Sequence, residues 1–440
     1  MKKAAKIVVV IIALSIGNTG YAQTVAPPYE VGTWQGFRPA AISFTFDDGS
    51  PNQYAKAIPM FNEFDLKMTL YIVTSPSWGW PANWSALQTA ASRGHEIGSH
   101  TVSHTSMGGM NDALQTTELK NSQDEINAHI TGQRCATLAY PYCVPSKKSL
   151  CAQYYIAARI CSGVIESRTP ADFMNLGSII CGELGSVKTT QDFISRAGSA
   201  VNSKGWCVFL IHGIDNDGGY SSLPSTTLRE TLEYFNANED KFWVSTFSNV
   251  ARYIKERAAV SVVESSAEED RFIVQVTDTL DNAIFNYPTT LRRPLPQEWP
   301  SVAVAQNGRT VESQILESNS LRYIQFDATP DSGEVIISRS NATSVQDSEN
   351  FVVTPLSLLQ NHPNPFNPST TIRFDLGLAE HVTLKVFDVS GREVATLLDE
   401  ELPGGRHSVL FNAEMLASGV YLLNLQAQGL SQYRKMLLLR

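Results

Sequence analysis

Two adjacent carboxylates follow a short apolar stretch in the first part of the chain. Residues 41–46 have the composition of a buried β-strand, and Asp47, Asp48 and a glycine follow directly. Successive side chains of a strand point to opposite faces, so Asp47 and Asp48 cannot have the same role. A bend at the end of the strand would bring both into one pocket, where one could bind a metal ion while the other moves protons. Because Asp-Asp-Gly is also an ordinary turn, this interpretation depends on the rest of the sequence.

Three histidines complete a possible metal and acid–base site. His100 and His104 have the spacing that places two side chains on one face of a helical turn. With one carboxylate they would give two nitrogen ligands and one oxygen ligand and leave coordination positions open, as in a catalytic metal site. His212 follows the apolar stretch 206–211, and imidazole is suited to general acid catalysis near neutral pH.

Strands and helices alternate around these residues. Strands are predicted at 41–46, 68–73, 136–140 and 206–211, and helices at 54–64, 84–93, 112–130 and 226–238, with Asn111 and Ser225 as caps. This alternation indicates a parallel sheet covered by helices, either a barrel or an open doubly wound sheet. In both, functional groups lie at the carboxyl ends of strands, where Asp47, Asp48 and His212 fall.

The sequence changes character after residue 258. Short β-type stretches separated by turn signals predict a β-sandwich over residues 259–342, which we interpret as a spacer, with glycan binding as the alternative. Residues 343–357 are polar and aperiodic, as is typical of a linker, and a further β-module covers 358–440. We therefore expect an α/β domain followed by two all-β sandwich modules.

Composition and the N-terminal residues bear on location and partners. The net charge of -9 argues against nucleic acid as a partner, and we expect a monomer. Residues 1–22 read as a signal peptide cleaved after Ala22, with a retained anchor as the alternative. Six cysteines between residues 135 and 207 suggest disulfides in an exported protein; their pairing stays open, and buried free thiols are the alternative.

In this order, the motifs resemble the polysaccharide deacetylase family (carbohydrate esterase family 4, the NodB homology domain). Residues 45–49 (Thr-Phe-Asp-Asp-Gly), the pair His100 and His104, and Leu210-x-His212 correspond to three of its motifs, and we assign residues 23–258 to this domain. The resemblance implies a distorted (β/α) barrel. It also implies a hydrolase that removes O- or N-acetyl groups from a glycan.

The resemblance further implies a role for each site residue. Asp48, His100 and His104 would bind a divalent metal ion, usually zinc in this family, with cobalt, nickel or iron as alternatives. Asp47 would be the base that deprotonates the metal-bound water. His212 would be the acid that protonates the leaving group. Metal activation of water and general acid–base catalysis are physically consistent with these residue types.

The third motif departs from the family pattern, because residues 139–143 read Ala-Tyr-Pro-Tyr-Cys in place of Arg-Pro-Pro-Tyr-Gly. The backbone N–H of Tyr142 would stabilise the oxyanion of the tetrahedral intermediate. The arginine that orients the base is missing, and Arg159 is the candidate replacement. The aspartate of the fourth motif has no clear match; Asp215 and Asp172 are possible substitutes. A catalytically impaired, surface glycan-binding protein on the same barrel is therefore the alternative function.

Residues 358–440 resemble the C-terminal sorting domain (type A) of type IX secretion. The resemblance rests on a proline-rich entry at 362–368, the Asp388-x-x-Gly-Arg turn and the basic end at 433–440. It implies secretion, or attachment at the outer-membrane cell surface, with the type IX machinery as a partner. A small immunoglobulin-like accessory sandwich is the alternative.

The resemblance to the deacetylase family implies an acetylated polysaccharide or oligosaccharide as a second partner. Acetylated xylan is the first candidate, and chitooligosaccharide and peptidoglycan stay open. Trp78, Trp80 and Trp84 lie between a predicted strand and helix, where exposed indole rings could stack on sugars; packing within the protein is the alternative.

Overall fold

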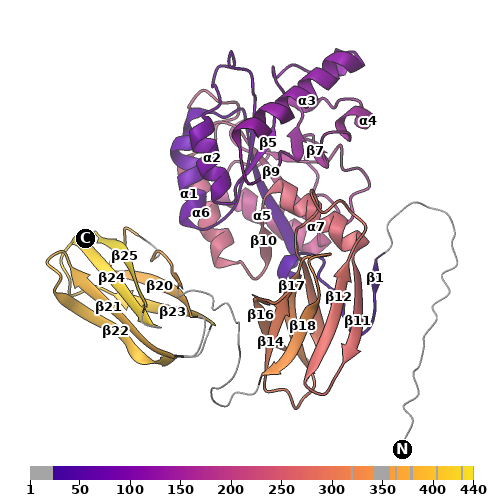
Figure 1. The fold of residues 1–440 in the computed structure, drawn as a ribbon. Coiled ribbons are helices and arrows are strands. Elements are labelled where there is room, and N and C mark those ends of the chain that lie inside the picture. Colours follow the sequence, from indigo (N-terminus) through magenta and orange to yellow (C-terminus); the bar gives the residue numbers. More distant parts are fainter. Residues whose placement is uncertain are drawn as a thin grey trace, which may run out of the picture. The chain divides into compact units, whose positions relative to one another are not determined.

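A computed structural model gives the fold of the protein (Figure 1). It describes residues 23–318, 321–340, 357–361, 364–376, 380–402, 405–427 and 430–439. The predicted signal peptide and residues 343–356 of the predicted linker lie outside the described residues. The chain divides into two compact units, Met1–Thr343 and Ser344–Arg440, and each is described by itself.

A parallel sheet forms the centre of the first unit. Its strands run in the order β7-β6-β5-β4-β3-β9-β8, and β10 pairs with the first residues of β3. Their bounds are β3 Ala40–Asp47, β4 Thr69–Ile72, β5 Glu96–Ser99, β6 Thr137–Ala139, β7 Ala157–Arg159, β8 Ile179–Ile180, β9 Trp206–Ile211 and β10 Phe242–Val244. All eight residues of β3 are buried, as expected for a strand enclosed on both faces.

The sheet curls toward closure. Leu176 pairs in parallel with Arg159 at the end of β7, and the chain then enters β8, which pairs with β9. The two edges of the sheet are thereby joined through residues 176–180. The distorted (β/α) barrel predicted for this part of the chain is confirmed.

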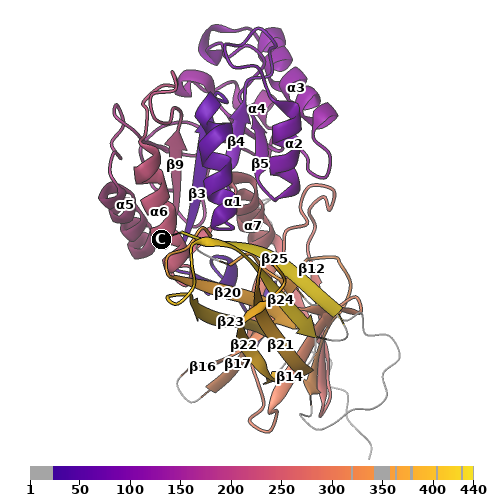
Figure 2. The ribbon, with the colours of Figure 1, turned by 90° about the vertical axis from the view of Figure 1, so that its left-hand side faces the viewer.

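Helices cover the outside of this sheet, and Figure 2 shows α1, α2 and α6 lying over β3, β4, β5 and β9. Their bounds are α1 Ile58–Glu63, α2 Trp84–Ser92, α3 Asp112–His129, α4 Lys148–Cys151, α5 Thr190–Ser203, α6 Ser225–Ala237 and α7 Phe247–Ala259. Asn111 caps α3, because its side chain accepts from the Leu114 N–H. The prediction that Ser225 caps α6 is wrong: Ser225 is the first helical residue, and its N–H donates to the Asp215 carboxylate instead.

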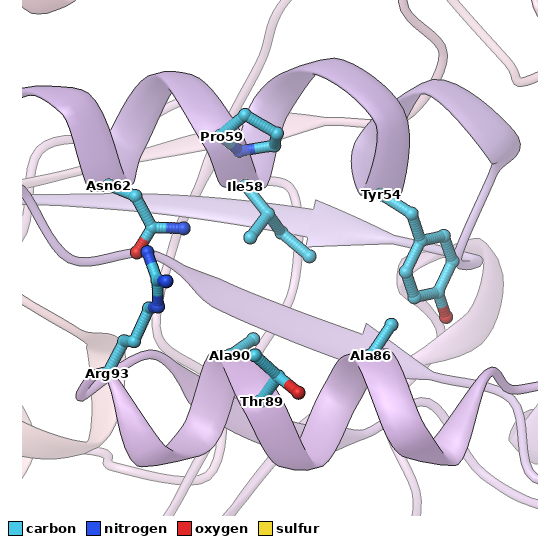
Figure 3. A pocket seen from close by; sticks show the side chains of 8 residues that line it. All are labelled: Tyr54, Ile58, Pro59, Asn62, Ala86, Thr89, Ala90 and Arg93. Carbon is cyan, nitrogen blue, oxygen red and sulfur yellow. The ribbon is translucent and has the colours of Figure 1, made fainter. Parts of the chain in front are cut away.

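The helix predicted from residue 54 begins with a π-helical turn, η2 Gln53–Ala57, before α1. A groove of about 440 Å³ runs between this helix and α2 (Figure 3). Tyr54, Ile58 and Asn62 face it from one side, and Thr89 and Arg93 from the other. No residue proposed for the catalytic or metal site lines the groove.

Strand β5 carries a buried carboxylate. Glu96 accepts hydrogen bonds from the Thr69 and Thr137 hydroxyl groups and from the Ser248 N–H in the first turn of α7. The N-terminus of a helix favours negative charge, so the carboxylate joins β4, β6 and α7 to β5. This bonding explains how a strand with a polar sequence, Glu96-Ile-Gly-Ser99, lies in the middle of a buried sheet.

The neighbouring His95 is buried as a neutral ring, so we expect the protein to lose stability in acid. Its Nδ1 accepts from the Met68 N–H, and its Nε2 lies 3.3 Å from Asn62 Oδ1. Only the neutral ring can accept at one nitrogen and donate at the other. Burial lowers the pKa of His95 to about 4. Because the unfolded ring titrates near 6.5, this contribution to stability is complete above that pH and is lost as the pH falls toward 4. The loss should reach about 3 kcal/mol.

Urea denaturation at pH 7.5 and pH 4.5, with a chelator present throughout, measures this loss. His95→Gln keeps one donor and one acceptor but cannot titrate, so its stability should fall less between the two pH values than that of the unmodified protein. An equal fall in both proteins would show that His95 is not responsible.

The second part of this unit is a β-sandwich. One sheet has the order β1-β11-β12-β18-β14-β15 and the other β16-β17-β13-β2. The strands are β1 Thr24–Val25, β2 Glu30–Val31, β11 Ser261–Ala267, β12 Arg271–Thr277, β13 Thr289–Pro294, β14 Ser301–Gln306, β15 Arg309–Val311, β16 Ser313–Ser318, β17 Leu321–Ala328 and β18 Val335–Ser340. Apolar residues of both sheets form one core, which includes Phe272, Trp299 and Phe326.

Residues 24–31 differ from the predicted division of the chain. They were expected within the α/β domain, but β1 pairs with β11 and β2 pairs with β13 of the sandwich. The barrel and the sandwich are also joined by hydrogen bonds from Tyr253 Oη to the Gly32 carbonyl, 2.8 Å, and from the Tyr287 N–H to Glu256 Oε1, 2.8 Å. The N-terminal segment thus connects both parts of the first unit.

The C-terminal unit is also built from two antiparallel sheets, with orders β19-β20-β23 and β22-β21-β24-β25. Its strands are β19 Ser357–Leu358, β20 Ser369–Leu376, β21 Glu380–Asp388, β22 Glu393–Leu402, β23 Gly405–Asn412, β24 Gly419–Ala427 and β25 Leu430–Leu438. The Asp388 carboxylate closes the β21–β22 turn, because it accepts from the Ser390 and Arg392 N–H groups and pairs with the Arg392 guanidinium. The Asp-x-x-Gly-Arg sequence is therefore a turn motif, and the predicted all-β module is confirmed.

Among the helices of the described residues, none combines the length and the apolar character needed to cross a bilayer.

Candidate active site

The adjacent carboxylates lie where β3 ends. Asp47 is its last residue, and Asp48 has a left-handed backbone conformation with φ 75°. A non-glycine residue rarely adopts this conformation, and here it turns the second carboxylate back toward the first. Both side chains are buried, and His100 Nε2 lies 3.5 Å from Asp47 Oδ2 and 3.6 Å from Asp48 Oδ1. The bend inferred from the sequence is present.

His100 and His104 also converge, but not on a helical turn. They lie in the loop after β5, and the positive φ of Thr101, 66°, and of His104, 57°, interrupts any helix. The Glu118 carboxylate on α3 accepts from two N–H groups of this loop and so replaces the helical hydrogen bonds. The helical-turn prediction was therefore wrong, although the two imidazole rings still lie 4.7 Å apart.

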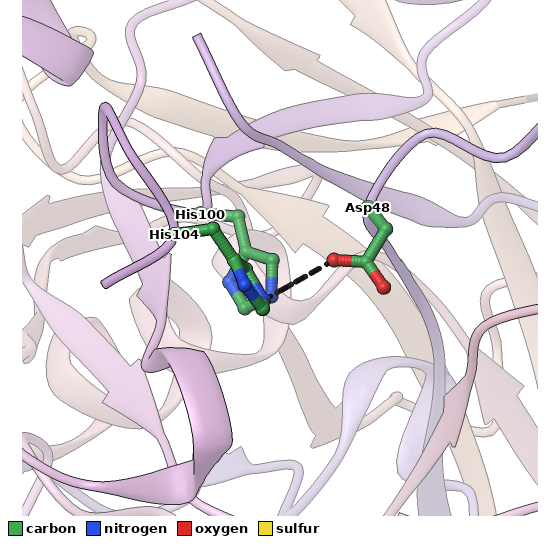
Figure 4. Close-up of side chains that lie close together, drawn as sticks. All are labelled: Asp48, His100 and His104. Atoms are coloured by element: carbon green, nitrogen blue, oxygen red, sulfur yellow. Dashed lines mark ion pairs between the residues drawn. The ribbon is translucent and has the colours of Figure 1, made fainter. Parts of the chain in front are cut away.

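Asp48, His100 and His104 could hold one metal ion. One candidate ligand atom from each lies within 4.8 Å of the others, and His104 Nε2 is 3.3 Å from Asp48 Oδ1 (Figure 4). Asp48 Oδ1 is buried and accepts no hydrogen bond from the described residues. A buried carboxylate oxygen without a donor is costly, and a cation would compensate it. Two imidazoles and one carboxylate therefore fit a divalent ion such as zinc.

Neighbouring groups orient these three side chains. His100 Nδ1 lies 2.8 Å from the Ala139 carbonyl oxygen and donates to it, which leaves Nε2 free to face Asp48. The Trp78 indole N–H donates to the Asp48 carbonyl over 3.0 Å, and its ring lies 4.7 Å from that of His104. Trp78 is therefore part of the site's framework, whereas Trp84 stacks on His129 of α3.

Asp47 is held by an arginine and faces the third histidine. Arg159, at the end of β7, is 1% exposed, and its Nη2 is hydrogen-bonded to Asp47 Oδ1. The replacement suggested from the sequence thus lies against the carboxylate. His212 follows β9, and its Nε2 is 3.9 Å from Asp47 Oδ2. The structure therefore brings Asp47, Asp48, His100, His104, His212 and Arg159 to one end of the barrel.

Burial and neighbouring charges shift the pKa values of the two carboxylates in opposite directions. Burial opposes ionisation of Asp47, but Arg159 and His100 outweigh it and lower the pKa of this group. Burial, reinforced by the charge of Asp47, raises the pKa of Asp48 to about 7. Burial lowers the pKa of His100 to about 3 and that of His212 to about 4, which keeps both rings neutral. A neutral imidazole is the form that binds a metal ion.

Tyr142 lies at the edge of the site, beside His104. It has φ 55° within the short turn Pro141–Cys143, its side chain is 67% exposed, and its ring is 4.9 Å from that of His104. A disulfide joins Cys143 to Cys161, two residues after Arg159. The bond ties the Tyr142 turn to the strand that carries the arginine. The other four cysteines, all within the described residues, are buried free thiols.

The two suggested substitutes for the fourth-motif aspartate do not contact His212. Asp215 pairs with Lys56 and accepts from the Ser225 N–H, and Asp172 pairs with Lys148. His212 Nδ1 is buried and has no hydrogen-bond partner among the described residues. Those two suggestions were therefore wrong, because sequence distance from His212 says nothing of where the loop directs each carboxylate.

Sequence reasoning missed the residues from Ser50 to Gln53, the first residue of the π-helical turn. The Ser50 hydroxyl donates to the His212 carbonyl, and the Asn52 side chain donates to the Ile214 carbonyl. Gln53 donates to the carbonyls of both Asp47 and His212. The only signal in the sequence was their position directly after the Asp-Asp-Gly motif.

Comparisons with known proteins agree with this geometry. Residues 35–155 match a family model described as polysaccharide deacetylase. Residues 361–439 match one described as secretion system C-terminal sorting domain. The chain thus contains a domain of the polysaccharide deacetylase family and ends in a secretion sorting domain.

Two curated relatives share part of their length with it. A gellan lyase of a Bacillus species is 29% identical over 332 residues, which are 70% of this chain and 13% of that protein. A probable peptidoglycan-N-acetylglucosamine deacetylase of Arthroderma benhamiae is 28% identical over 102 residues, which are 23% of each. The chain therefore spans a minor part of the curated relatives that it matches.

Two solved structures are similar to part of the chain. A putative polysaccharide deacetylase from Mycobacterium smegmatis has a TM-score of 0.41 and 15% identity and covers 54% of this chain and 98% of its own. A family 4 acetyl xylan esterase from Clostridium thermocellum has a TM-score of 0.34 and 15% identity and covers 48% of this chain and 89% of its own.

Proposed function

We propose that the protein is a secreted, metal-dependent deacetylase that hydrolyses O- or N-acetyl groups of a glycan. The observation that carries this proposal is the convergence of Asp48, His100 and His104 beside a second carboxylate, Asp47, that is paired with a buried arginine. A divalent cation held by the first three residues, zinc in the first instance, would polarise an acetyl carbonyl and lower the pKa of a coordinated water.

The chain's own residues would handle the protons. Asp47 stays ionised beside Arg159 and would accept a proton as the general base. His212, on the other side of Asp47, is neutral at rest, so it would take up a proton during the reaction and then pass that proton to the leaving alcohol or amine. The Tyr142 N–H would donate to the oxyanion of the tetrahedral intermediate. The Asp47–Arg159 pair supports this function over that of a catalytically impaired glycan-binding protein.

Aromatic side chains around the site fit a sugar substrate. Tyr220, 50% exposed, lies 5.1 Å from the His212 ring, and Tyr142 lies beside His104. Trp80 lies 6.2 Å from Trp78, which itself borders His104. Aromatic faces stack on the apolar faces of sugar rings, so this rim supports an acetylated polysaccharide or oligosaccharide as the substrate.

Acetate release tests the proposal directly. Acetylxylan comes first in the substrate panel, followed by acetylated chitooligosaccharide, peptidoglycan and gellan, each with and without a chelator. We expect release from at least one substrate, loss of that activity on chelation and recovery on addition of zinc, cobalt, nickel or iron(II). Retained glycan binding without acetate from any substrate would instead favour the binding protein.

The sorting domain supports the type IX secretion machinery as a second partner and the outer-membrane surface or the medium as the destination. The same proposal includes the division into residues 1–22, 23–258, 259–342, 343–357 and 358–440, with strands β1 and β2 of the second segment added to the sheets of the third. It also includes the removal of the first segment on export and the monomeric state.

A further inference from the structure

Gln53 lies against the backbone of two site residues, Asp47 and His212. It is the first residue of the π-helical turn η2 and is 0% exposed. π-Helical turns occur frequently at functional sites, because they displace one residue out of the regular helical pattern. This turn places the side chain of Gln53 between the ends of β3 and β9.

The amide of Gln53 joins these two strands where their own pairing stops. The last paired residues of β3 and β9 are Phe46 and Ile211. One residue further along each strand, the carbonyls of Asp47 and His212 both accept from Gln53 Nε2, at 2.5 and 2.9 Å. A side-chain amide has two N–H donors, so one side chain satisfies both carbonyls. Gln53 therefore extends the β3–β9 pairing by one residue.

The neighbours of Gln53 reinforce the same connection. The Ser50 hydroxyl donates to the His212 carbonyl over 3.3 Å. The Asn52 N–H donates to Asp217 Oδ2 over 2.9 Å, and the Asn52 side chain donates to the Ile214 carbonyl over 2.8 Å. The segment after Asp48 is thus bonded to the segment after His212 at several points.

The side-chain oxygen of Gln53 lowers the stability of the fold. It is buried and has no hydrogen-bond partner among the described residues. An unpaired buried oxygen opposes folding, and an apolar side chain of the same size would not carry this penalty. The amide is therefore better explained by its two donors, which act on the backbone of the proposed base and of the proposed acid.

We propose that Gln53 is a positioning residue that sets the separation of Asp47 and His212, a role that rests on the proposed deacetylase function. The two side chains are 3.9 Å apart, and each projects from a residue whose carbonyl Gln53 binds. Gln53 is not one of the three residues that could hold the cation, Asp48, His100 and His104. Its loss should therefore change catalysis and the environment of His212 but not the amount of bound metal.

The chain contains a matched control. Gln123, in α3, is 5% exposed, and its Nε2 also donates to two backbone carbonyls, those of Cys135 and Tyr154. Gln53→Met and Gln123→Met each remove two donors at nearly constant volume. Both should lower the melting temperature. Gln53→Met alone should lower kcat for acetate release, by about 10²-fold as for a displacement of about 1 Å, with little change in KM.

Two further measurements separate this inference from the proposed function. Zinc content after dialysis should equal that of the unmodified protein in both variants. The ring signal of His212, assigned by its absence in His212→Gln, should shift in the NMR spectrum of Gln53→Met and not of Gln123→Met. If the unmodified protein releases no acetate, the proposed function fails, while the His212 signal still decides the role of Gln53. An unshifted signal, or a kcat equal to that of Gln123→Met, would overturn it.

Gln53→Glu is a second variant that tests the same proposal if Gln53→Met does not fold. A protonated glutamate keeps one donor and an ionised one keeps none. Its kcat relative to the unmodified protein should therefore rise as the pH is lowered. A ratio of one at every pH would also overturn the proposal.

Discussion

Asp47→Asn is expected to reduce acetate release by about 10²–10⁴-fold, the usual contribution of a general acid or base. Asparagine has the shape of aspartate and can still accept from Arg159, but its amide cannot take up a proton. Bound metal should be retained, because Asp48, His100 and His104 hold the ion without this side chain. Acetate release and elemental analysis on the same preparation measure the two effects.

Asp48→Asn is the matched comparison at the next residue. It should lose both the metal and the activity, because it weakens the one carboxylate in the candidate ligand set. The contrast between the two variants tests the division of roles between adjacent carboxylates. Full activity of Asp47→Asn would show that another group is the base.

Arg159→Met is expected to move the acid limb of the pH–activity profile to higher pH and to lower kcat. Asp47 remains buried in this variant, so without the guanidinium its pKa should rise and a larger fraction should be protonated at a given pH. Removal of one partner from a buried ion pair typically costs about 3–5 kcal/mol of stability. Profiles of kcat/KM against pH, with urea denaturation, measure both effects.

Arg257→Met controls for the loss of a buried arginine elsewhere. Arg257 is 9% exposed and donates to the carbonyls of Thr33 and Arg168, away from the site. The Arg257→Met substitution should lower the stability of the protein and leave its pH–activity profile unchanged. An unshifted acid limb in Arg159→Met would mean that this arginine supports the fold but not the ionisation of Asp47.

Several features of the site could be predicted from local sequence. One strand ends at Asp47, directly before Asp48, and another ends at Ile211, directly before His212. Because neighbouring parallel strands bring their carboxyl ends to one edge of a sheet, such residues meet whenever the strands are identified correctly. His100 directly follows β5, but it was found from its spacing to His104 and from the family motif, not from a predicted strand.

Other parts of the prediction failed where tertiary contacts outweigh local pattern. Strand β5 was not predicted, because Glu96 and Ser99 are polar and only their buried hydrogen-bond partners stabilise them in the sheet. The helical turn expected for His100 and His104 is replaced by a loop that Glu118 stabilises. In both, the deciding partner lies on another element of the fold.

The sequence by itself determined which side chains could do the chemistry: two carboxylates and three histidines, each at or near the end of a strand. Only the tertiary structure decided which distant groups control them. It selected Arg159 as the partner of Asp47, placed Asp215 and Asp172 elsewhere, paired Cys143 with Cys161 and brought Gln53 to both strand ends. The physical reason is that strand periodicity is a local property, whereas a charge pair or a buried hydrogen bond depends on which elements the fold brings together.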